Sequence, residues 1–143
     1  MNPQEFLFPH GILSPVLTPL TSNYQVDVDL LVNHAHKVLD DGCVGIVPFG
    51  TTGEALSVGR EERIDSLEAL IKSGIDPSKL LVGTGQTSLD DTLILTRHAV
   101  EMNSAGVLVL PPFYYKNPSE EGLYKYFASL IDRINDDRLR VFL

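Results

Sequence analysis

Two threonines enclosed by glycines, in the segment Gly50-Thr51-Thr52-Gly53-Glu54, directly follow a short apolar run. Glycine permits backbone conformations that turn successive N–H groups toward one point, and flanking hydroxyls add donors. Such a loop can hold a carboxylate or a small phosphate. It has neither the Gly-Lys-Ser/Thr of a Walker loop nor the Gly-x-Gly-x-x-Gly of a dinucleotide site. A tight turn with solvated threonines is the alternative, because polar turn residues are common.

Two adjacent tyrosines, Tyr114 and Tyr115, lie in the proline-rich segment 111–118. A phenol at the end of a strand can relay a proton or cross an interface, but such tyrosines usually pack with the hydroxyl facing outward. Lysine is another candidate, because a Schiff-base lysine must be desolvated to be nucleophilic near neutral pH. Only Lys116 lies in a loop at the carboxyl end of a predicted strand, and its neighbours Asn117 and Pro118 predict a solvated amine. These residues alone identify no convincing nucleophile.

The histidines and the cysteine predict no metal site. His34 and His36 are two apart on a predicted helix, so they face different directions and cannot share a metal ion. Cys43 is the only cysteine, which excludes a disulfide scaffold and fits a cytoplasmic location. We therefore expect no metal and no cofactor.

Composition narrows the class of protein and of partner. The 143 residues are 43% hydrophobic and 21% charged, which predicts one soluble globular unit. The net charge of −8 argues against nucleic acid or an anionic membrane as a partner. No apolar run approaches the roughly 18 residues of a membrane helix. The opening MNPQEFLFPHG has no basic segment and does not resemble a secretory signal.

The elements that must position these residues alternate regularly. Apolar runs begin near residues 12, 44, 80, 106 and 139. Segments with helical periodicity separate them, at about 27–41, 58–73, 88–103 and 119–134. Asp27 and Ser57 are the expected N-caps of the first two helices, and Ile64, Leu67 and Ile71 are the expected buried stripe of the second. The repeat of roughly 30 residues is typical of βα units with a parallel sheet.

Two architectures fit this order. Five strands can form a complete doubly wound domain, such as a flavodoxin-like fold. Alternatively, residues 1–143 are the amino-terminal part of one (β/α)₈ TIM barrel, about its first four and a half βα units, because such a barrel needs roughly 250 residues. Residues Arg140–Leu143 are typical of a fifth strand with nothing after it. Because a complete fold rarely stops in mid-strand, this favours the barrel. In both architectures ligands bind at the carboxyl ends of the strands. The loops that follow these ends are 19–24, 50–56, 85–88 and 111–118.

These motifs together resemble the dihydrodipicolinate synthase / N-acetylneuraminate lyase family. The match consists of Gly50–Glu54 with the following Ala-Leu-Ser-x-x-Arg-Glu-Glu-Arg63, and of Thr18-Pro19, Gly83–Gly85 and Pro111–Tyr115 in the same order. The resemblance implies a class I aldolase-type lyase on a TIM barrel. It would act on pyruvate or a related 2-oxo acid through a Schiff base, as a homotetramer of paired dimers.

The resemblance also implies roles for three residues. Thr51 and Thr52 would bind the substrate carboxylate, Thr51 would join a proton relay, and Tyr115 would complete that relay in a neighbouring subunit. The family's lysine lies on the sixth strand, and its central relay tyrosine lies in a Tyr-Asn-Val-Pro-like motif after the fifth. Neither occurs before Leu143, so we expect this chain to be inactive alone. The alternative function is a self-contained five-stranded domain that binds an anion or another protein.

Overall fold

The computed structural model describes residues 10–143. Five short strands alternate with four α-helices, in the order that the sequence predicts. The strands are β1 (Leu13–Pro15), β2 (Gly45–Val47), β3 (Leu81–Gly83), β4 (Gly106–Leu108) and β5 (Val141–Phe142). The α-helices are α1 (Val28–Asp40), α2 (Arg60–Lys72), α3 (Leu89–Glu101) and α4 (Glu120–Ile134), and two 3₁₀ turns are η1 (Ala55–Ser57) and η2 (Pro77–Lys79).

Side-chain caps fix where three of the helices begin. The Asp27 carboxylate accepts from the Leu30 N–H at 3.0 Å, and the hydroxyls of Ser88 and Ser119 cap α3 and α4 in the same way. The predicted cap of α2 is wrong. Ser57 ends η1 instead, and α2 begins after Gly59, whose N–H donates to the Glu62 carboxylate at 3.3 Å. The extra 3₁₀ turn takes up Ser57, the residue that the sequence predicts as the helix cap.

The strands are parallel and follow one another in chain order. β1 pairs with β2, and β4 lies between β3 and β5. A bridge between Ile46 and Leu80 joins the two groups of strands. A flavodoxin-like domain would place β1 between β2 and β3. The consecutive order is that of a (β/α)₈ barrel, and it confirms the barrel prediction over the doubly wound alternative.

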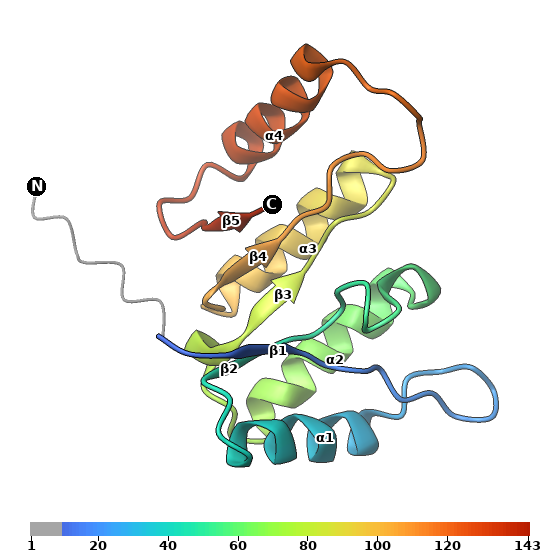
Figure 1. Cartoon of the computed structure of the whole chain (residues 1–143), viewed down its shortest axis with the longest axis vertical. Coiled ribbons are helices and arrows are strands. Elements are labelled where there is room, and N and C mark those ends of the chain that lie inside the picture. Colours follow the sequence, from blue (N-terminus) through green and yellow to red (C-terminus); the bar gives the residue numbers. More distant parts are fainter. Residues whose placement is uncertain (1–9) are drawn as a thin grey trace, which may run out of the picture.

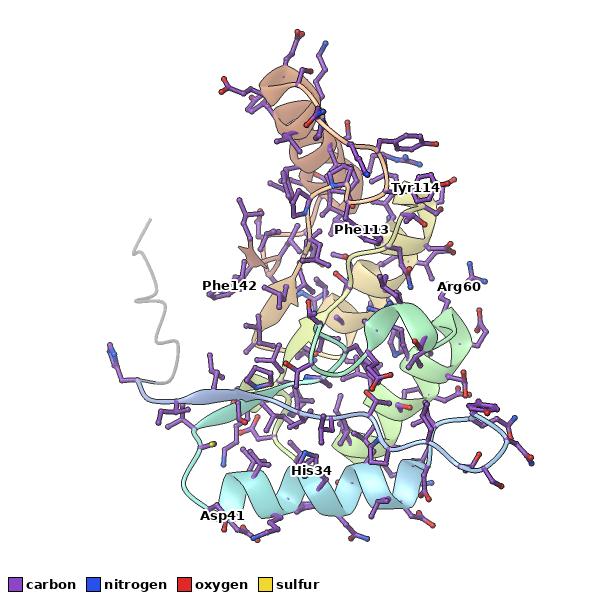
Figure 2. All side chains as sticks on the ribbon, turned by 45° about the vertical axis from the view of Figure 1, so that its right-hand side comes forward. His34, Asp41, Arg60, Phe113, Tyr114 and Phe142 are labelled. Atoms are coloured by element: carbon purple, nitrogen blue, oxygen red, sulfur yellow. The ribbon has the colours of Figure 1, made fainter. Side chains whose placement is uncertain are left out.

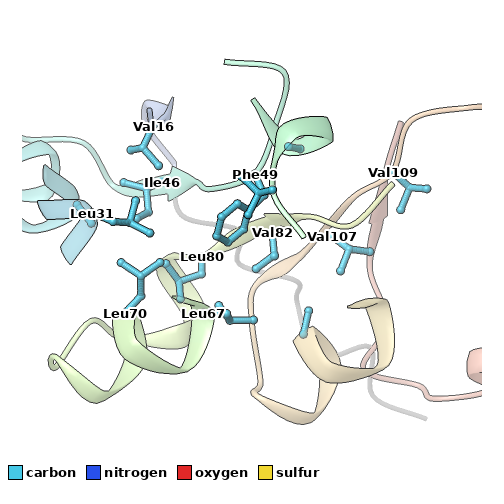
Figure 3. Close-up of a cluster of buried hydrophobic side chains, with 14 of the residues drawn as sticks. Val16, Leu31, Ile46, Phe49, Leu67, Leu70, Leu80, Val82, Val107 and Val109 are labelled. Atoms are coloured by element: carbon cyan, nitrogen blue, oxygen red, sulfur yellow. The ribbon is translucent and has the colours of Figure 1, made fainter. Parts of the chain in front are cut away.

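The helices form a row along the sheet, with each helix in contact with the next (Figure 1). The core lies between this row and the strands, and Figure 3 shows its centre, where Leu31, Leu67 and Leu70 of the helices meet Ile46 and Leu80. The opposite side of the sheet has no such cover among residues 10–143 (Figure 1). Leu17, which follows β1, is 57% exposed, and Leu110, which follows β4, is 38% exposed.

The buried face of α2 differs from the predicted stripe. Arg63, Ser66, Leu67 and Leu70 are buried, whereas Ile64 and Ile71 are only half-buried. The helix is therefore rotated so that a cation enters the layer between helix and sheet. None of the helices among the described residues is long and apolar enough to cross a bilayer.

Candidate active site at the carboxyl ends of the strands

A cavity of about 180 Å³ opens where the predicted site should be, at the carboxyl ends of β2, β3 and β4. Its walls come from the loop after β2, the turn η1 and the ends of the next two strands. The lining residues are Phe49, Gly50, Thr51, Glu54, Ala55, Leu56, Ser57, Gly83, Gly85, Leu108 and Leu110. Such a concave, mostly apolar space with a few polar groups is suited to a small molecule.

The loop after β2 is held in one conformation by its own backbone. Phe49 and Glu54 have positive φ angles of 59° and 50°, which few residues other than glycine adopt. The Glu54 N–H donates to the Thr51 carbonyl at 3.1 Å, which closes the loop. From the segment after β1, the Thr18 hydroxyl donates to the Gly53 carbonyl at 2.7 Å. The loop therefore has a fixed shape before any ligand binds.

Thr51 and Thr52 keep free hydrogen-bond donors. Both side chains are exposed, and within residues 10–143 neither their backbone N–H groups nor their hydroxyls have a partner. Thr51 lines the cavity, whereas Thr52 lies beside it without lining it. Uncompensated donors at the mouth of a small cavity are suited to a carboxylate, whose oxygens accept several hydrogen bonds.

Gly83 and Gly85 let the strand ends approach one another closely. A Cβ atom at Gly83 would collide with the Phe49 carbonyl, and one at Gly85 would lie 2.8 Å from the Leu110 nitrogen. Both glycines also line the cavity. Close packing of the backbone is therefore what shapes the floor of the site.

Arg63 lies behind this floor, and the sequence reasoning missed its importance. Its side chain is 2% exposed, and its Nη2 atom donates to the Gly83 carbonyl. Its guanidinium carbon lies 5.6 Å from the centre of the Phe49 ring. Burial lowers the pKa of Arg63 to about 10, so the group remains charged at neutral pH. Arg63 lies four residues before Leu67 and seven before Leu70, so all three share one face of the helix. This spacing could have predicted the burial of Arg63.

Tyr115 does not join this cavity. It lies in the loop between β4 and α4 and is 75% exposed, with its ring 5.3 Å from that of Tyr114 at a right angle. Figure 2 shows Phe113 and Tyr114 in the same loop. The structure therefore brings Thr51 and the cavity together but leaves Tyr115 outside it.

The lysines and acidic groups offer no further catalytic group. All five lysines are exposed, namely Lys37, Lys72, Lys79, Lys116 and Lys125. Within the described part of the chain, no three His, Cys, Asp or Glu side chains are grouped so as to hold a metal ion. Glu54 is the one carboxylate that lines the cavity, and it is exposed.

Comparison with known proteins gives consistent matches. The model of the dihydrodipicolinate synthetase family matches residues 8–139. A DapA-like lyase of Chloroflexus aurantiacus is 39% identical over 90% of this chain and 43% of its own length. A 4-hydroxy-tetrahydrodipicolinate synthase of Prochlorococcus marinus is 36% identical over 92% of this chain and 43% of its own length. This chain thus spans less than half the length of these relatives.

Solved structures of similar proteins agree with the fold. A dihydrodipicolinate synthase from Agrobacterium tumefaciens superimposes with a TM-score of 0.85 at 34% identity, over 91% of this chain and 46% of that one. A 2-keto-3-deoxygluconate aldolase variant of Sulfolobus solfataricus, in complex with pyruvate, gives a TM-score of 0.80 at 28% identity, over 92% of this chain and 43% of that one.

Proposed function

Because this chain belongs to the dihydrodipicolinate synthetase family, we propose that its complete protein is a class I aldolase-type lyase or synthase that acts on pyruvate or a related 2-oxo acid. The observation that carries this proposal is the cavity at the carboxyl ends of β2 to β4, with the unpartnered donors of Thr51 at its mouth. Pyruvate in the structure of a similar aldolase supports the choice of ligand.

In this proposal Thr51 and Thr52 bind the carboxylate of the 2-oxo acid. Their N–H groups and hydroxyls point to no protein acceptor in residues 10–143, so a bound carboxylate would gain hydrogen bonds without breaking any within the protein. Holding the carboxylate at the loop would leave the ketone carbon free to meet an amine. Thr51 lines the cavity and would also pass a proton through its hydroxyl.

Tyr115 has a different place in the proposal. Its ring is 75% exposed in the loop before α4, and it does not line the cavity of its own chain. An exposed phenol on a loop can reach a site in a neighbouring subunit. We therefore assign Tyr115 to the proton relay of a second subunit in a cytoplasmic homo-oligomer.

The amine that forms the Schiff base is not among the lysines of this chain. A nucleophilic lysine must lose its hydration to be uncharged near neutral pH, and all five lysines here are exposed. The chain by itself is therefore proposed to bind the 2-oxo acid without converting it. Treating it with pyruvate and borohydride should give no stable adduct by mass spectrometry, and an adduct would contradict this assignment.

Binding at the threonine loop can be tested on the 143-residue chain by following backbone amide signals in NMR spectra during a titration with pyruvate. We expect the Thr51 and Thr52 signals to move, and Thr51→Val to weaken binding by roughly tenfold because a charged acceptor loses a hydrogen bond. Thr87→Val is the matched control, since Thr87 is exposed in the next loop but does not line the cavity. Pyruvate binding that ignores Thr51→Val would overturn the proposed site.

A further inference from the structure

Arg63 is a buried cation with no ion-pair partner among residues 10–143. Its side chain is 2% exposed, and no carboxylate among residues 10–143 forms an ion pair with it. Its Nε and Nη1 atoms are buried and have no hydrogen-bond partner. Only Nη2 is satisfied, by the Gly83 carbonyl. Burying a charge without a partner of opposite sign is costly, so an anion close to Arg63 would lower this cost.

The position of this cation relates it to the cavity. The two groups that Arg63 contacts, the Phe49 ring and the Gly83 carbonyl, both line the cavity. The guanidinium therefore contacts two residues of the cavity wall without lining the cavity itself. Because the guanidinium is buried, solvent ions screen its charge less than they would screen a charge at the surface.

We propose that Arg63 is a specificity-determining residue, whose lone positive charge makes the cavity prefer an anionic ligand over a neutral ligand of the same shape. This inference rests on the proposed function, because it takes the carboxylate of the 2-oxo acid as the anion that the charge of Arg63 attracts. The threonine donors would orient that carboxylate, and Arg63 would supply the long-range attraction. Glu54 opposes this effect only weakly, because its carboxylate is exposed and screened by water.

A purely structural role for Arg63 makes a different prediction. Its contacts with Phe49 and Gly83 join α2 to the ends of β2 and β3, so removing them would disturb any ligand in the cavity. Such a disturbance would weaken neutral and charged ligands alike. The ratio of the affinities for a charged and a neutral ligand therefore distinguishes the two roles of Arg63.

The experiment compares pyruvate with pyruvamide, its neutral isostere, as ligands of the 143-residue chain. We expect the unmodified chain to prefer pyruvate, and Arg63→Met to reduce pyruvate affinity by roughly tenfold while pyruvamide affinity stays the same. Arg63→Lys keeps the charge and should keep the preference. An equal loss for both ligands, or an unchanged preference, would refute the role of Arg63. If the unmodified chain binds neither ligand, the proposed function fails as well.

A measurement on the unmodified chain covers the case in which Arg63→Met does not fold. The Nε–H signal of Arg63 in NMR spectra should move when pyruvate is added, because a nearby negative charge polarises the guanidinium. Pyruvamide at the same occupancy should leave it in place. A signal that responds equally to both ligands, or to neither, would refute the inference independently of any variant.

Discussion

At the scale of single residues, the candidate site depends on backbone groups that approach closely. Gly83 has no room for a side chain beside the Phe49 carbonyl, and Gly53 would place a Cβ atom 3.0 Å from the Val16 carbonyl oxygen. These neighbours belong to the backbone, which cannot move aside without shifting a strand. The shape of the cavity therefore depends on close backbone contacts at these two glycines.

We expect Gly83→Ala to destabilise the chain by about 3 kcal/mol or more, because overpacking against backbone forces β2 and β3 apart. Chemical denaturation followed by circular dichroism measures this change. Gly50→Ala is the control, since its added Cβ would meet nothing closer than 3.9 Å. Equal losses for the two variants would show that the close approach at Gly83 does not matter.

At the scale of elements, polar caps decide where the helices start. Asp27 begins α1 by accepting the Leu30 N–H, and the loop before it carries the chain from β1 over to the outer layer. A helix that begins one turn later would withdraw Leu31, which is fully buried, from the core. The cap thus connects the local sequence to the packing of the first βα unit.

We expect Asp27→Ala to lower the free energy of unfolding by about 1 kcal/mol, which is typical of a lost N-cap. Asp27→Asn should retain most of the stability, because its amide oxygen can accept the same hydrogen bond. Thermal or urea unfolding of the two variants side by side tests the difference. A loss of the same size for both would point to the charge of Asp27 and not to its cap.

At the scale of the whole molecule, the described strands make an open, curved layer with helices along one side only (Figure 1). Ile12 and Leu17 flank β1 at one end of this layer and are 72% and 57% exposed. Exposed apolar residues beside an edge strand favour association with other chains. The fold as described therefore leaves apolar surface that a complete barrel would cover.

We expect the 143-residue chain to self-associate as its concentration rises, and sedimentation velocity would measure this. Replacing Ile12 and Leu17 by lysine should reduce the association, because lysine at a sheet edge opposes pairing. Ile94→Lys is the control, since Ile94 is 43% exposed on α3, away from β1. A chain that stays monomeric at every concentration would contradict the expectation that this apolar surface drives association.

The sequence by itself determined the alternation of strands and helices, the Asp27 N-cap of α1 and the threonine loop as a candidate anion site. These features follow from local rules, because helical periodicity, capping and glycine-rich turns depend on residues close together in the chain. The same local rules failed at Ser57, where a 3₁₀ turn intervened before α2.

Only the tertiary structure decided which strands are neighbours, that Thr51 lines the cavity while Thr52 does not, and that Arg63 is buried behind its wall. Each of these depends on contacts between residues far apart in the chain. A parallel sheet can order the same five strands in several ways with the same periodicity. A rotation of α2 by part of a turn decides whether Arg63 faces water or Phe49, and packing against the sheet sets that rotation.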